Sequence, residues 1–201
     1  MAYLAAVFIG YLLGCSNMAL YVSRSKGVDL RSGGSQNLGA SNVVSMMGWG
    51  AGILTAVHDI GKTVLSVFLA RFLFPDLAYI GIAAGVASIF GHIFPFYLKF
   101  RGGKGFASYV GLLLVLNWKF GLVMMVVIAI LTLVTDFIVV GTTVTVIASP
   151  VFLGLTMSVI PALIIAAASV VILWKHRENY VRMYNGTELG LSKKRHGLFK
   201  K

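Results

Sequence analysis

Apolar stretches long enough to cross a lipid bilayer as α-helices recur along this chain of 201 residues. Hydrophobic residues make up 58% of the sequence and charged residues only 11%, whereas a soluble domain carries about 25% charged residues. A chain this apolar is not expected to expose its whole surface to water. The sequence therefore predicts an all-α polytopic membrane protein, with one domain over residues 1–201 and a cytoplasmic tail from about residue 175.

Seven transmembrane helices are expected, over residues 2–22, 47–74, 77–98, 106–117, 119–135, 137–156 and 158–174. The fourth stretch is shorter than the roughly 20 residues that a complete span needs. We interpret it as a half-helix that is buried among its neighbours, where membranes tolerate irregular backbone. The alternative is a single bent helix over residues 106–135, which would reduce the count to six.

Basic residues lie unevenly along the chain. Fourteen of the 17 Lys and Arg residues fall in the segments 23–46, 99–105 and 175–201. Because cytoplasmic segments carry an excess of Lys and Arg, we expect these three segments in the cytoplasm and the N-terminus outside. Six spans would place the first segment and the tail on opposite sides, so seven are favoured. The net charge of +11 is explained by this asymmetry, and no nucleic-acid partner is expected.

A glycine-rich basic segment, Phe100-Arg101-Gly102-Gly103-Lys104-Gly105, follows the third expected span. Glycine allows a ligand to approach the backbone closely and permits positive φ, and successive N–H groups in such turns can bind anions. Lys104 and Arg101 add positive charge, and a helix beginning at Phe106 would present its N-terminus to the same anion. The segment therefore suggests a phosphate cradle formed by Gly102, Gly103, Lys104 and Gly105. The alternative is a flexible basic turn between two helices.

The first cytoplasmic connection contains Gly33-Gly34-Ser35-Gln36-Asn37-Leu38-Gly39-Ala40-Ser41-Asn42. Its glycines allow close approach, and the side chains of Ser35, Asn37 and Asn42 offer neutral hydrogen bonds to an anion or a polyol. The alternative is an ordinary polar loop.

Three ionisable residues, His58, Asp59 and Lys62, interrupt the second span. Charges within a membrane are costly and usually functional, although Asp59 and Lys62 are spaced to share one helix face and neutralise each other.

His92, near the end of the third span, is either an interfacial residue or a donor to phosphate. No cluster has zinc-ligand spacing, so no metal or other cofactor is expected.

The polar tail carries His176, Asn179 and Arg182, which would lie toward one side of a helix, followed by Gly186, Thr187 and Glu188. These side chains suit a role in closing over a bound ligand. The alternative is a solvated basic helix that leaves the membrane.

The segments 34–42, 91–105 and 176–188 resemble, in order, the three motifs of the bacterial acyl-phosphate:glycerol-3-phosphate acyltransferases, the PlsY-type membrane acyltransferases. The resemblance covers nearly the whole chain. It implies seven spans, an external N-terminus and an active site on the cytoplasmic side of the bacterial inner (plasma) membrane. It also implies transfer of a fatty acyl group from acyl phosphate to glycerol 3-phosphate in phospholipid biosynthesis. The product would be 1-acyl-sn-glycerol 3-phosphate, also called lysophosphatidic acid, formed without a metal.

Roles follow from the same resemblance. Acyl phosphate would lie near His92 and the glycine-rich segment. The acceptor would contact Ser35, Asn37, Asn42, Lys104, His176, Asn179 and Arg182. The catalytic candidates are Ser35, His92, His176 and Asn179, and Glu188 is a supporting candidate. Asp59 and Lys62, which lie outside the three motifs, are supporting candidates because they are charges within a span. The expected partners are the two substrates, the lipid bilayer and the soluble enzyme that makes acyl phosphate.

The sequence departs from the family pattern at three positions. Gln36 stands where the family commonly has glycine or a similarly small residue, and Ser41 stands where it has threonine. Ser45 stands where the family has an arginine that belongs to the glycerol phosphate site, so the acceptor is less clearly indicated than the donor.

The chemistry fits these residues, because a mixed anhydride is already activated and requires no protein nucleophile. The sequence does not decide whether the general base is the donor's own phosphate, His92 or His176. A small multi-pass transporter and a diverged paralogue with another acceptor or a non-catalytic role are the alternative functions. The absence of a visible repeat, and the gathering of polar motifs on one face, favour the enzyme over a transporter.

Overall fold

The computed structural model describes residues 1–190 and residue 192, and the regular elements of this part of the chain are helical. They are α1 (Ala2–Cys15), α2 (Met18–Lys26), α3 (Ala40–Met47), α4 (Trp49–Leu73), α5 (Ile80–Ile93), the 3-10 turn η1 (Phe96–Leu98), α6 (Phe106–Leu116), α7 (Trp118–Thr135), α8 (Ile138–Thr156), α9 (Val159–Lys175) and α10 (Arg177–Tyr184). The predicted all-α class is confirmed. The basic residues at 193–195 and 200–201 lie outside the described residues. The chain forms two compact units, residues 1–118 and 119–201.

Several helices are long and apolar enough to cross a membrane. Among the described residues, five segments meet this criterion, and α9 with α10, bent by 43°, raises the count to six. The eleven-residue α6 is too short, as expected for residues 106–117. Asn117 is extended, with φ −152° and ψ 98°, so α6 and α7 are two helices rather than one. The multi-pass membrane architecture is confirmed, and the count of seven spans stays a prediction.

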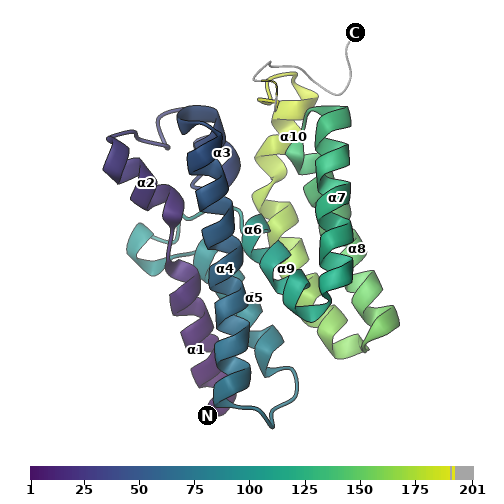
Figure 1. Cartoon of the computed structure of the whole chain (residues 1–201). Coiled ribbons are helices and arrows are strands. Elements are labelled where there is room, and N and C mark those ends of the chain that lie inside the picture. The colour runs from purple at the N-terminus through teal and green to yellow at the C-terminus, as the bar shows by residue number, and fades with distance from the viewer. Residues whose placement is uncertain (191, 193–201) are drawn as a thin grey trace. The chain divides into compact units, whose positions relative to one another are not determined.

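In the first unit, α1, α4 and α5 lie side by side (Figure 1). Glycines bring the backbones of α1 and α5 together: a Cβ atom on Gly10 would lie 2.9 Å from the carbonyl carbon of Ala84, and one on Gly14 would lie 2.6 Å from the Cα atom of Ser88. Small residues are favoured in this way between membrane helices, because packing must replace the hydrophobic drive available in water.

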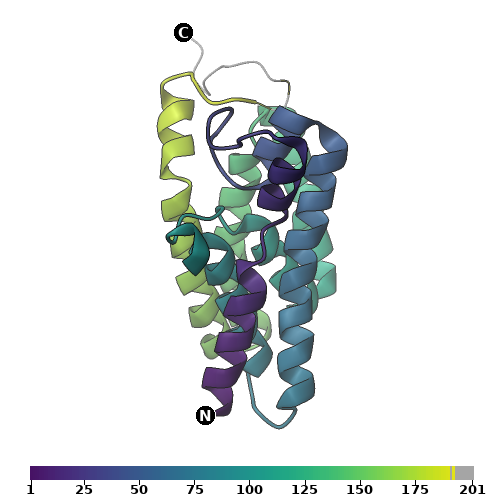
Figure 2. The same cartoon turned by 90° about the vertical axis from the view of Figure 1, so that its left-hand side faces the viewer.

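The first unit has two chemically different ends. The N-terminus and the α4–α5 connection lie at one end, where the Tyr3 hydroxyl donates to the carbonyl oxygen of Ala78, whereas α2 and α3 lie at the other (Figure 2). At that second end, Nη2 of Arg31 donates to the carbonyl oxygen of Arg101 at 2.8 Å. The first connection and the glycine-rich segment therefore meet at one end of this unit.

The first apolar stretch does not form the continuous helix expected over residues 2–22. It breaks at Ser16 and Asn17, between α1 and α2. Asn17 is extended, with φ −134° and ψ 100°, and its side-chain oxygen accepts from the N–H of Leu20 at 2.9 Å. This N-cap bond offers the backbone an alternative to continuing the helix. The break leaves the carbonyl of Ser16 available to another partner.

In the second unit, the rings of Phe120 in α7 and Phe152 in α8 stack with centroids 3.9 Å apart. Asp136, in the turn between these helices, adopts a φ of 67°. Its carboxylate accepts from the N–H of Ser192 at 2.8 Å and from the Ser192 hydroxyl at 2.6 Å. The α7–α8 turn and the segment after α10 therefore lie at the same end of the unit.

Candidate functional site

The glycine-rich segment folds back onto the C-terminal end of α5. The N–H of Gly102 donates to the carbonyl oxygen of Ile93 at 3.0 Å, and the N–H of Gly103 donates to that of His92 at 3.1 Å. The sequence suggested that successive N–H groups here would point at a phosphate. For these two glycines that expectation does not hold, because their N–H groups already donate to carbonyl oxygens.

Glycine is required in this segment for close packing. A Cβ atom on Gly102 would lie 2.6 Å from Cδ of Pro95, and one on Gly103 would lie 2.7 Å from the carbonyl oxygen of Leu38. The same Cβ on Gly103 would also collide with Nε2 of His92. The backbone of Gly103 therefore lies directly against the imidazole edge of His92.

The basic residues of the segment, Arg101 and Lys104, precede the start of α6 in the sequence. Gly105, with φ 85°, precedes the first residue of α6, and Lys104 is half-buried, whereas Arg101 is exposed. The first N–H groups of a helix have no partner within the helix and favour an anion. A phosphate cradle here would thus depend on the Lys104 and Arg101 side chains and on this helix terminus, and the cradle remains a prediction.

Asn42 organises the first connection and is 1% exposed. Its Oδ1 accepts from the N–H of Ser35 at 2.8 Å, and its Nδ2 donates to the carbonyl oxygen of Leu30 at 2.9 Å. Both ends of the amide are thus engaged by the loop itself. Asn42 was predicted to contact the acceptor, but this geometry suits it to holding Ser35 in place.

Ser35 and Asn37 are half-buried, next to two residues of positive φ. Gly34 has φ 59° and Gln36 has φ 57°, and the N–H of Gln36 donates to the carbonyl oxygen of Gly33 at 3.0 Å. Left-handed backbone is ordinary for glycine and unfavourable for glutamine. The departure from the family pattern at Gln36 therefore falls where the backbone itself favours glycine.

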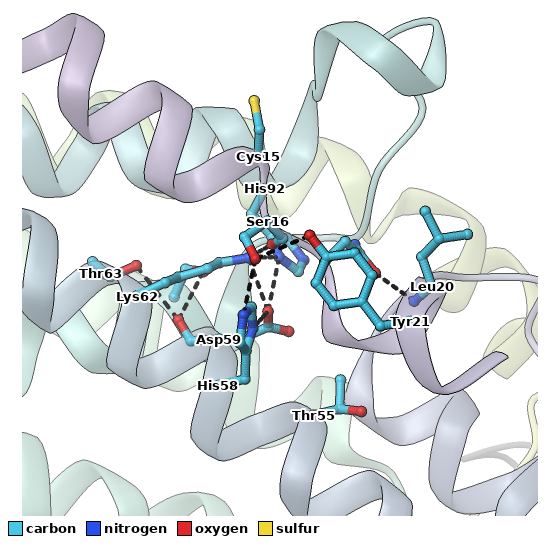
Figure 3. A network of polar contacts seen from close by, with 12 residues as sticks. Cys15, Ser16, Leu20, Tyr21, Thr55, His58, Asp59, Lys62, Thr63 and His92 are labelled. Carbon is cyan, nitrogen blue, oxygen red and sulfur yellow. Dashed lines mark hydrogen bonds and ion pairs between the residues drawn. The ribbon is translucent and has the colours of Figure 1, made fainter. Parts of the chain in front are cut away.

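A buried ionic cluster joins α4, α5 and the break between α1 and α2 (Figure 3). Asp59, Lys62 and His92 are 2%, 6% and 3% exposed. Nζ of Lys62 lies 2.8 Å from Oδ1 of Asp59 and 2.8 Å from Nδ1 of His92. It also donates to the carbonyl oxygen of Ser16 at 2.7 Å. The predicted Asp59–Lys62 pair is present, and it includes His92 as a third member.

Two further contacts enclose this cluster. The hydroxyl of Ser16 lies 3.0 Å from Nε2 of His58, and Nδ1 of His58 lies 3.4 Å from Oδ1 of Asp59. No pattern in the sequence predicted the role of Ser16. The polar pair Ser16-Asn17 in the middle of the first apolar stretch is the sequence signal that could have indicated the helix break. The break frees the Ser16 carbonyl from the helix, so it can accept from Lys62.

The tail residues form a second cluster, within residues 119–201. The carboxylate of Glu188 accepts from Nδ2 of Asn179 and from Nε of Arg182, each at 2.6 Å. The turn after α10 brings Glu188 back, since its N–H donates to the carbonyl oxygen of Arg182 at 3.1 Å and Gly186 adopts φ 69°. Glu188, which was predicted as a supporting residue, thus bridges two residues predicted to contact the acceptor.

The imidazole of His176 is anchored through Nδ1. Its Nδ1 lies 2.8 Å from the carbonyl oxygen of Ile172, one turn earlier in α9. A carbonyl oxygen only accepts, so Nδ1 carries a proton. In the neutral imidazole the lone pair is therefore on Nε2, and a role of His176 as the general base stays a prediction.

Each unit thus assembles part of the predicted site. The first unit joins the first connection to the glycine-rich segment and His92, and the second joins Asn179 and Arg182 through Glu188. Within the described part of the chain, no group of three or more His, Cys, Asp or Glu side chains is arranged to hold a metal ion.

Comparison with known proteins gives consistent matches. The model of a family described as glycerol-3-phosphate acyltransferase matches residues 4–186. Glycerol-3-phosphate acyltransferase 1 of Oceanobacillus iheyensis is 34% identical over 200 residues, covering 96% of this chain and 96% of that protein. A glycerol-3-phosphate acyltransferase of Coxiella burnetii (strain Dugway 5J108-111) is 37% identical over 195 residues, covering 94% and 97%.

Two crystal structures of PlsY, an integral membrane glycerol 3-phosphate acyltransferase, have a similar fold. The glycerol 3-phosphate form gives a TM-score of 0.88 at 28% identity, covering 95% of this chain and 96% of that one. The lysophosphatidic acid form gives a TM-score of 0.84 at 26% identity, covering 96% and 98%.

Proposed function

The chain belongs to the glycerol-3-phosphate acyltransferase family, and we propose that it transfers a fatty acyl group from acyl phosphate to glycerol 3-phosphate. It is an integral membrane acyltransferase, and phospholipid biosynthesis is the process to which its family belongs. Solved relatives of the same fold are described in a glycerol 3-phosphate form and in a lysophosphatidic acid form. These two molecules are the acceptor and the product of the proposed reaction.

The observation that carries the proposal is the meeting of the first connection with the glycine-rich segment through Arg31 and Arg101. Both substrates carry phosphate, so two anions must approach each other. Arg31, Arg101 and Lys104 bring positive charge to the two segments that meet there. Fixed cations and N–H donors stabilise the charge that develops in the transition state, and holding the two reactants together supplies further acceleration.

The reaction needs no protein nucleophile. The attacking hydroxyl oxygen of glycerol 3-phosphate bonds to the acyl carbon, the bond from that carbon to the phosphate oxygen breaks, and inorganic phosphate leaves. The hydroxyl proton passes to the base, either the departing phosphate or Nε2 of His176. Ser35 and Asn179 orient the hydroxyl, and Asn37, Lys104 and Arg182 contact the acceptor. Asn42 and Glu188 hold Ser35, Asn179 and Arg182 in position.

The proposed topology has seven spans, an external N-terminus and a site that faces the cytoplasm at the bacterial inner membrane. It is supported in the first unit by the Arg31–Arg101 bond, which keeps two basic segments at one end. In the second unit it is supported by the Asp136–Ser192 bonds. We also propose that a soluble enzyme makes the acyl phosphate and supplies it to this protein as the acyl donor.

The test is turnover by the purified protein in lipid nanodiscs. Palmitoyl phosphate and glycerol 3-phosphate should yield lysophosphatidic acid and inorganic phosphate in equal amounts, followed by mass spectrometry and a phosphate assay. Palmitoyl-coenzyme A in place of palmitoyl phosphate should give no product. Product from the coenzyme A ester alone would overturn the choice of donor. Uptake of glycerol 3-phosphate into proteoliposomes without acylation would instead support a transporter.

A further inference from the structure

The ammonium group of Lys62 is surrounded by three acceptors, one in the break between α1 and α2, one in α4 and one in α5. Its Nζ lies 2.7 Å from the Ser16 carbonyl oxygen, 2.8 Å from Oδ1 of Asp59 and 2.8 Å from Nδ1 of His92 (Figure 3). An ammonium has three N–H donors and no acceptor. The three contacts therefore use each N–H group of Lys62 once.

This arrangement assigns the proton on His92. Because Lys62 donates to Nδ1, that nitrogen must accept, so neutral His92 carries its hydrogen on Nε2. Nε2 is also the atom that a Cβ on Gly103 would meet. The protonated nitrogen of His92 thus faces the glycine-rich segment, and its lone pair faces Lys62.

Asp59 keeps the charge of Lys62 compensated within the membrane. Its Oδ1 accepts from Lys62 and lies 3.5 Å from Nδ1 of His92. A buried charge without a partner is strongly unfavourable, so the Asp59 carboxylate and the Lys62 ammonium require each other. Without Lys62, the nearest acceptor for a proton on Nδ1 would be Asp59, and the other tautomer of His92 would become the favoured one.

We propose that Lys62 is a positioning residue that holds His92 in the Nε2–H tautomer, so that His92 donates a hydrogen bond to the donor's phosphate and does not act as the general base. This inference rests on the proposed function for the identity of the ligand. The tautomer itself is independent of any substrate. It leaves the departing phosphate and His176 as the candidates for the base, because the loop-facing nitrogen of His92 has no lone pair to offer.

The tautomer is measured by nuclear magnetic resonance on protein labelled with ¹⁵N-histidine in nanodiscs. The His92 signals are assigned by their loss in a His92→Asn variant. Wild type should show a protonated Nε2 and an unprotonated Nδ1 at His92. In Lys62→Met, which keeps an apolar stem and removes the donors, the proton should move to Nδ1, toward Asp59. Thr63→Val is the matched control, because Thr63 is buried beside Lys62 and its hydroxyl bonds to the Ser88 hydroxyl and the backbone carbonyl of Asp59, not to the side chains of Asp59, Lys62 or His92.

Activity provides the second readout. In Lys62→Met, kcat with palmitoyl phosphate should fall roughly ten- to a hundredfold, because that is the rate loss expected when one charge-assisted hydrogen bond is lost. The KM for glycerol 3-phosphate should stay nearly unchanged. Thr63→Val should retain both the tautomer and kcat. If Lys62→Met does not fold, the Asp59→Leu, Lys62→Met double variant replaces it, since an apolar pair can substitute for a buried ion pair. Its His92 should show a mixture of tautomers.

Two outcomes would overturn the inference: wild-type His92 with its proton on Nδ1, or unchanged His92 signals in the Lys62 variants. A wild-type protein that shows the expected tautomer but no turnover of acyl phosphate would count against the proposed function and leave the role of Lys62 in place.

Discussion

The guanidinium of Arg31 donates to the backbone carbonyl oxygen of Arg101 at 2.8 Å, across 70 residues of sequence. The bond places a cation of the first connection on the glycine-rich segment, in the same connection that lacks the family's arginine at Ser45. Ser45 is half-buried in α3. Since Arg31 and Ser45 belong to the same segment, we expect Arg31 to supply part of the positive charge that Ser45 does not.

Ser45→Arg should lower the KM for glycerol 3-phosphate by roughly ten- to a hundredfold, because one charge-assisted hydrogen bond is worth about 1.5–3 kcal/mol and 1.4 kcal/mol is tenfold in affinity. The KM for acyl phosphate should remain nearly constant. Arg31→Ala should raise the KM for glycerol 3-phosphate, and adding Ser45→Arg to it should recover most of the loss. Steady-state kinetics with a panel of acceptors measures each effect. A wild-type preference for an uncharged polyol would contradict this account of the acceptor site.

Gly103→Ala should abolish most turnover while the protein still inserts and purifies. The added Cβ would meet the imidazole of His92 and lie 2.7 Å from the Leu38 carbonyl oxygen, so the loop must move away from α5. Gly61→Ala is the matched control, because a Cβ there meets nothing within 4 Å. It should retain activity and gain about 0.5–1 kcal/mol of stability from the helix interior. Equal activity in both variants would mean that the glycine-rich segment only connects two helices and has no role in catalysis.

Lys104→Ala should also remove most turnover without loss of the folded protein. Lys104 is the basic residue nearest in sequence to the start of α6, and losing one charge-assisted partner costs about 1.5–3 kcal/mol. Arg101→Ala, the exposed neighbour, should have a smaller effect. Comparing kcat and both KM values for the two variants tests this ranking, and the opposite ranking would move the phosphate toward Arg101.

Gln36→Gly should stabilise the protein, because Gln36 has φ 57° and left-handed backbone costs a non-glycine residue about 1–2 kcal/mol. Gln36→Ala keeps that strain and serves as the control. The expected difference in Tm between the two variants is about 2–4 °C per kcal/mol for a chain of this size. Thermal unfolding in detergent measures it. Identical Tm values would mean that the turn relaxes to another conformation.

Glu188→Ala should lower kcat and raise the KM for glycerol 3-phosphate together, because Asn179 and Arg182 each lose a bond of 2.6 Å. Glu188→Gln keeps an acceptor oxygen for Asn179 but loses the charge that pairs with Arg182. It should therefore recover kcat more fully than KM. If both variants change only the melting temperature, Glu188 has a structural role alone.

The membrane class, the order of the helices and the location of the short α6 follow from local properties of the sequence. Apolar length predicts a span wherever it lies, and the residues before Phe106 mark the start of α6 without knowledge of the fold. The i, i+3 spacing of Asp59 and Lys62 likewise predicts their contact within one helix. The break at Ser16 was missed, because a single N-cap bond decides it within an otherwise continuous apolar stretch.

The partners of Lys62 were decided only by the tertiary structure. His92 lies 30 residues away and the Ser16 carbonyl 46 residues away, and no local pattern relates them. Their meeting depends on glycines that let α1 and α5 approach closely, and on the packing of α4 beside them. The sequence by itself determined which ionisable groups enter the membrane. The packing of three helices decided which acceptor each N–H group of Lys62 reaches, and through that contact which nitrogen of His92 holds the proton.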